Sequence, residues 1–86
     1  PVIDHDAGLS VRGDVGVSLL NDRYHLGLPD EDVDTIGGLV WHELGRLPEA
    51  GDEVAVSGTP HRLRVEAMDR QAVRRVTVLR GGEGPA

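Results

Sequence analysis

The chain has 86 residues, a formal net charge of −6 and no cysteine, which indicates one small domain without disulfides or a thiolate metal site. Residues 1–53 carry 12 acidic and 3 basic side chains, whereas residues 54–86 carry 3 acidic and 6 basic ones. An acidic half of this size argues against a nucleic-acid partner, and no apolar stretch reaches the length needed for direct insertion into a membrane.

The first third of the chain predicts a lead-in, one strand and one helix. Residues 1–8 lack hydrophobic periodicity and are expected to be a flexible lead-in, and a short strand is predicted over residues 9–11. Asp14 is a suitable N-cap, and apolar residues follow it at helical spacing. This pattern predicts a first helix over residues 14–25.

A second helix has the clearest boundaries in the chain. Thr35 is expected to cap its N-terminus, and Gly45 followed by Pro48 is expected to end it. Four apolar residues between these signals fall on one helical face, which predicts an amphipathic helix that packs on the sheet. The helical stripe comprises Ile36, Leu39, Val40 and Leu44, and its expected partners are Leu63, Val65, Val76 and Val78.

The last third predicts a three-stranded antiparallel meander. Strands are expected over residues 53–56, 61–68 and 73–79, because apolar and polar residues alternate there between turn-forming segments. Residues 81–86 are rich in glycine and predict a disordered tail. The predicted class is α+β: a small, mostly antiparallel sheet with both helices on one face, in a domain over residues 9–80.

The acidic loop ahead of the second helix carries alternating carboxylates. Asp30, Asp32 and Asp34 have the spacing of a calcium-binding loop. Such a loop needs glycine at its sixth position and glutamate at its twelfth, where this chain has Thr35 and Trp41. A solvated lead-in to the helix is favoured, with a weak divalent-ion sensor as an alternative.

A glycine pair opens the second helix. Gly37 and Gly38 would allow a phosphate to approach backbone amides, which leaves a nucleotide- or flavin-binding (FAD) module as a second alternative. No lysine and no G-x-G-x-x-G motif accompany the pair. The favoured interpretation is that the missing side chains let the helix lie close to the sheet.

Three further motifs do not amount to a functional site. His42–Glu43 resembles the start of a zinc-protease motif, but its second histidine would stand at the position of Arg46. Arg12–Asp14 spells an integrin-type tripeptide that a turn and a helix cap explain better. No serine, histidine and acid are grouped for nucleophilic catalysis. The sequence therefore predicts a protein without enzymatic activity and assigns no catalytic, cofactor-binding or metal residues.

Six segments in a fixed order carry a family resemblance. They are Leu28–Pro29 with the acidic loop, Asp34–Val40, Gly45–Pro48, Gly51–Asp52, Val65–Asp69 and Arg75–Val78. Over residues 9–78 the chain resembles the transporter-associated domain of the CorC/HlyC type. One departure lies in the last turn, where relatives usually have glycine and this chain has Arg70.

The resemblance implies an organisation for the whole protein. Such domains end bacterial magnesium and cobalt efflux or hemolysin-like proteins, after a membrane region and paired cystathionine-synthase-like (CBS) modules, at the cytoplasmic face of the membrane. The implied role is regulation or assembly that modulates ion transport, with the CBS and transmembrane regions of the parent protein as partners and homodimerisation left open. The fold is also similar to part of the FAD-binding domains of some oxidoreductases, which is a fold-level analogy alone.

Overall fold

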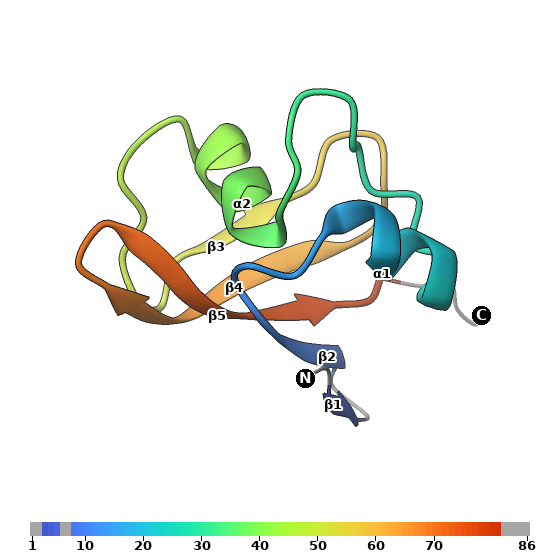
Figure 1. Cartoon of the computed structure of the whole chain (residues 1–86), viewed down its shortest axis with the longest axis horizontal. Coiled ribbons are helices and arrows are strands. Elements are labelled where there is room, and N and C mark those ends of the chain that lie inside the picture. The colour runs from blue at the N-terminus through green and yellow to red at the C-terminus, as the bar shows by residue number, and fades with distance from the viewer. Residues whose placement is uncertain (1–2, 6–7, 82–86) are drawn as a thin grey trace.

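Five strands and two helices form a two-layer α+β structure in which both helices lie on the same face of the sheet (Figure 1). The computed structural model of the chain describes residues 3–5 and 8–81. The strand order is β1-β2-β5-β4-β3, and every neighbouring pair is antiparallel. The predicted fold class is therefore confirmed. The elements are β1 (Ile3–His5), β2 (Gly8–Arg12), α1 (Val17–Tyr24), α2 (Ile36–Leu44), β3 (Glu53–Ala55), β4 (Arg62–Asp69) and β5 (Ala72–Leu79).

Both ends of α2 are formed as the sequence predicts. Thr35 Oγ1 accepts a hydrogen bond of 3.1 Å from the Gly38 N–H, which caps the N-terminus. At the other end Gly45 adopts a left-handed conformation with φ 72°, and its N–H donates to the Trp41 carbonyl. Neither helix of the described residues is long and apolar enough to cross a membrane.

α1 begins later than predicted, and the expected N-cap at Asp14 is wrong. The N-cap position is Gly16, without a side-chain cap, and the Val17 N–H donates instead to the Asp34 carbonyl at 2.9 Å. Asp14 uses its carboxylate to pair with Arg12 at 2.6 Å. The start of α1 is thus set by a contact with the segment before α2, which local sequence rules do not include.

β1 is a strand where the sequence predicts only a lead-in. Its three residues pair with β2, with Ile3 opposite Ser10 and His5 opposite Gly8. Three residues are too few to show an alternating pattern in the sequence. The strand is therefore recognised only by its backbone pairing with β2 in the structure. Residues 1–2 and 6–7 of the predicted lead-in, and 82–86 of the predicted tail, lie outside the described residues.

The hydrophobic core lies between α2 and the sheet, as the apolar stripe predicts. Ile36, Leu39 and Val40 are fully buried, and Leu44 packs at the edge of the cluster. The four predicted sheet partners all belong to the same cluster. Further buried members were not part of the predicted pairing: Leu9, Val11, Val17, Leu20, Leu26, Leu28, Val56 and Val73.

The β4–β5 hairpin turns through Arg70, the position where relatives usually have glycine. Asp69 lies opposite Ala72, so Arg70 and Gln71 form the loop. Arg70 has φ 58°, in the left-handed region. The backbone therefore keeps the conformation that glycine would adopt, at a cost of about 1 kcal/mol for a residue with a Cβ.

Shortening Leu39 tests the core. Leu39→Ala is expected to lower the free energy of unfolding by about 2–4 kcal/mol, because it leaves a cavity under α2. Leu19→Ala is the matched control, since Leu19 is 48% exposed on α1 and its loss should cost less than about 0.5 kcal/mol. Urea denaturation followed by Trp41 fluorescence measures both. Equal unfolding midpoints for the two variants would show that the core has been misplaced.

Candidate functional site

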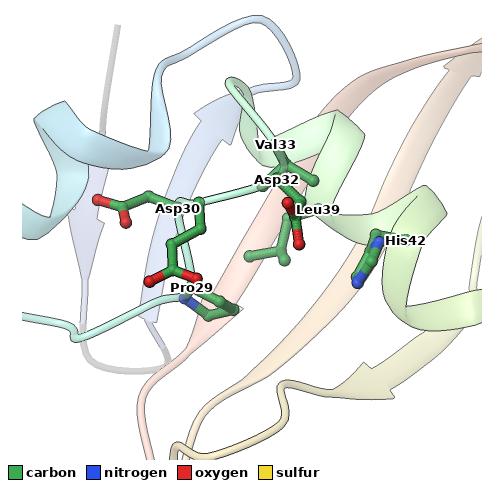
Figure 2. A pocket seen from close by; sticks show the side chains of 7 residues that line it. Pro29, Asp30, Asp32, Val33, Leu39 and His42 are labelled. Atoms are coloured by element: carbon green, nitrogen blue, oxygen red, sulfur yellow. The ribbon is translucent and has the colours of Figure 1, made fainter.

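A groove lies between α2 and the acidic loop that precedes it. Its volume is about 310 Å³, near the lower end of small-ligand pockets. Figure 2 shows the loop side chains on one side of the groove, His42 of α2 on the other and Leu39 between them. The complete lining is Pro29, Asp30, Glu31, Asp32, Val33, Leu39 and His42. The groove thus combines an apolar floor with an acidic rim.

The loop over residues 29–33 is held at both of its ends. The Asn21 side chain binds the main chain of Leu28 twice, donating to its carbonyl and accepting from its N–H, each at 2.9 Å. The Asp34 carbonyl accepts from the Val17 N–H at the other end. Between these anchors, the amides of residues 30–33 donate no hydrogen bond within the described part of the chain.

The alternating carboxylates of this loop do not converge on one point. Within residues 3–5 and 8–81, no group of three or more ligating side chains lies close enough to hold a metal ion. Asp30 accepts a long hydrogen bond of 3.3 Å from Ser18, which draws it toward α1. The divalent-ion hypothesis therefore gains no support from the loop geometry.

The N-terminus of α2 offers no free amide to a phosphate. The Ile36 N–H donates to the Val15 carbonyl and the Gly37 N–H to the Gly13 carbonyl, both at 2.9 Å. The Gly38 N–H is taken by the Thr35 cap. These bonds occupy the N–H donors in the first turn of α2. None of these three donors is left to bind a phosphate, which the nucleotide hypothesis requires.

Gly37 instead serves close backbone packing. A Cβ at this position would lie 2.9 Å from the Gly13 carbonyl oxygen and 3.2 Å from Val73 Cβ. Gly13 in turn lies against β5, where a Cβ would clash with the Val73 carbonyl. The favoured interpretation of the glycine pair is therefore confirmed for Gly37.

Adding one methyl group at each glycine separates their roles. Gly37→Ala is expected to destabilise the fold by about 1–3 kcal/mol, because backbone atoms of Gly13 must move. Gly38→Ala is the matched control: its Cβ meets the Thr35 hydroxyl at 3.3 Å and Val33 Cβ at 3.9 Å but no backbone atom, and the helix gains from alanine, so a change below about 1 kcal/mol is expected. Thermal and urea unfolding measure both. A Gly37→Ala protein as stable as the parent would refute the close approach.

The remaining motif residues are occupied by structural contacts. Glu43 accepts a hydrogen bond of 3.0 Å directly from the Ser57 hydroxyl, without a histidine as intermediary. Arg46, at the position of a second zinc ligand, binds Asp52 at 3.0 Å. The integrin-type tripeptide forms a turn in which the Val15 N–H donates to the Arg12 carbonyl. None of these contacts assembles a nucleophile with a base.

The face of the sheet away from the helices carries paired charges. Glu66 accepts hydrogen bonds from the Thr77 hydroxyl at 2.7 Å and from Arg64 at 2.8 Å. These donors hold the pKa of the Glu66 carboxyl below its ordinary value. Glu53 binds Arg62 at 3.2 Å on the neighbouring strand. The arginines of this face are thus largely neutralised within the chain.

The lowered pKa of Glu66 links stability to pH. The stabilisation of the fold by ionised Glu66 is complete above the ordinary glutamate pKa of 4.5. It is lost as the pH falls through the lower pKa that Glu66 has in the folded state. Glu66→Gln keeps an oxygen for Thr77 but cannot titrate, so its free energy of unfolding should fall less between pH 6 and pH 3 than that of the parent. Glu31→Gln removes a carboxylate that has no partner among the described residues, and it is the control for the loss of one negative charge. Urea titrations across this pH range measure the free energy of unfolding of each protein. If it falls with pH as steeply in Glu66→Gln as in the parent, the proposed role of Glu66 is contradicted.

Comparison with known proteins identifies the family. The model of the transporter associated domain CorC_HlyC matches residues 3–81. The chain belongs to this family.

Relatives and solved structures agree with this assignment. The magnesium and cobalt efflux protein CorC of Salmonella typhimurium is 30% identical over 76 residues, which are 88% of this chain and 25% of that protein. The solved putative Mg²⁺ and Co²⁺ transporter (CorC) associated region from Neisseria meningitidis is 25% identical with a TM-score of 0.78, covering 92% of this chain and 96% of its own. The transporter associated domain from a CBS domain protein of Porphyromonas gingivalis is 23% identical, with a TM-score of 0.76 and coverage of 95% and 99%. The chain spans about a quarter of the length of the CorC relative.

One segment that carries the family resemblance has a clear structural role in this CorC_HlyC domain. The loop from Gly45 to Asp52 connects α2 to β3, and the Asp52 carboxylate accepts from Arg46 and from the Glu49 N–H. Both bonds hold the pKa of the Asp52 carboxyl below its ordinary value. The Gly51 N–H donates to the Val65 carbonyl, which ties the loop to β4. The segment thus fixes the helix relative to the sheet.

Proposed function

We propose that this transporter associated domain is a non-catalytic regulatory and assembly module of a magnesium and cobalt efflux protein, at the cytoplasmic face of the membrane. The family match carries the proposal, together with the CorC relative, of which the chain spans a quarter. Ion translocation would then belong to the remaining three quarters of such a protein. The domain would act by contact with that remainder, including CBS modules of the kind named for the Porphyromonas gingivalis protein.

The structure of the domain fits a role in contact rather than in catalysis. The core closes completely between α2 and the sheet. The histidine and carboxylates of the groove lie on an open rim. A rim of this kind presents charge to a partner but does not enclose a substrate.

Removal of the domain from the full-length protein tests the proposal. Deleting residues 9–80 is expected to change the rate of cobalt efflux without abolishing it, because the transport path lies elsewhere. Efflux is measured from cells loaded with cobalt, with membrane levels of both proteins matched by immunoblot. Leu19→Ala in the full-length protein is the control and should keep the parental rate. Efflux that is identical with and without the domain would refute a regulatory role.

A further inference from the structure

The groove beside α2 has the features of a docking site for one side chain with its flanking residues. Val33 and Pro29 form an apolar floor, and the fully buried Leu39 lies beneath it. The floor is open to solvent along the acidic rim (Figure 2). An apolar hollow of this size on a small domain exposes surface that a partner can bury.

Two acidic side chains on the rim have no partner among the described residues. Glu31 and Asp32 make no hydrogen bond or ion pair in the part of the chain that the structure describes. On the sheet face, by contrast, Glu53 and Glu66 both bind arginine. Two adjacent carboxylates at the groove are therefore left without a compensating charge among the described residues.

We propose that the groove binds a basic segment of the parent protein, which places an apolar side chain on Val33 and Pro29 and arginine or lysine side chains against the acidic rim. This inference rests on the proposed function, since it names the surface through which the domain would contact the rest of the protein. Charge complementarity favours a cationic partner over phosphate or an anionic lipid surface. A second copy of the chain is disfavoured, because it carries the same charge of −6.

Hydrogen–deuterium exchange compares the 86-residue chain with the same residues inside the full-length protein. The amides of residues 30–33 have no partner among the residues that the structure describes, so they should exchange rapidly in the isolated chain. In the full-length protein their exchange is expected to be at least about tenfold slower. The protection should weaken in 1 M salt, because the contact depends on exposed charges.

Two double variants of equal charge provide the control. Glu31→Gln with Asp32→Asn should abolish the protection of residues 30–33 in the full-length protein. Asp22→Asn with Glu49→Gln makes the same change at exposed residues outside the groove and should leave the protection intact.

Four results would overturn the docking site. They are equal exchange of the loop in the two parental proteins, protection that survives the groove variant, protection lost in both variants, and protection of the isolated chain by magnesium alone. Cobalt efflux that responds to deletion of the domain while the loop shows no protection would refute the groove and keep the regulatory function. Protection without any effect of deletion on efflux would refute the regulatory function instead.

Discussion

The backbone contact between Gly13 and Gly37 is the constraint on which the arrangement of the domain depends. Gly13 lies directly against β5, and α2 begins directly against Gly13, so three main-chain segments stack without intervening side chains. The hydrogen bond from the Gly37 N–H to the Gly13 carbonyl fixes the separation. From that point α2 runs over the sheet at the depth where Leu39 and Val40 become fully buried.

The same contact determines what remains on the surface. The first amide of each helix donates to the segment that precedes the other helix. The Val17 N–H of α1 binds the Asp34 carbonyl, and the Ile36 N–H of α2 binds the Val15 carbonyl. These donors are therefore used inside the fold, whereas the amides of residues 30–33 have no bond among the described residues. The loop and the side of α2 then enclose the groove. The helix ends are thus satisfied inside the fold, whereas the acidic rim stays exposed.

The sequence predicted those parts of the fold that are encoded locally. The Thr35 cap, the Gly45 stop and the apolar stripe of α2 all depend on residues within one helix, and all three were right. The start of α1 could not be predicted in the same way, because its first amide finds its acceptor at Asp34. β1 carried too few residues for a periodic signal. The acidic loop was visible in the sequence, but the groove was not, since its opposite side is formed by His42 from another element.

The two charge halves of the sequence become two surfaces with different degrees of neutralisation. On the sheet, cross-strand geometry places arginine beside glutamate, as for Arg62 and Glu53, so neighbouring charges stabilise the strands. On the loop, Glu31 and Asp32 are adjacent like charges whose repulsion opposes folding. A segment that only had to connect two helices could be neutral, and the anchors at Leu28 and Asp34 would hold it equally well. The unpaired carboxylates add nothing to the fold, and the proposed contact with a basic segment would give them a role.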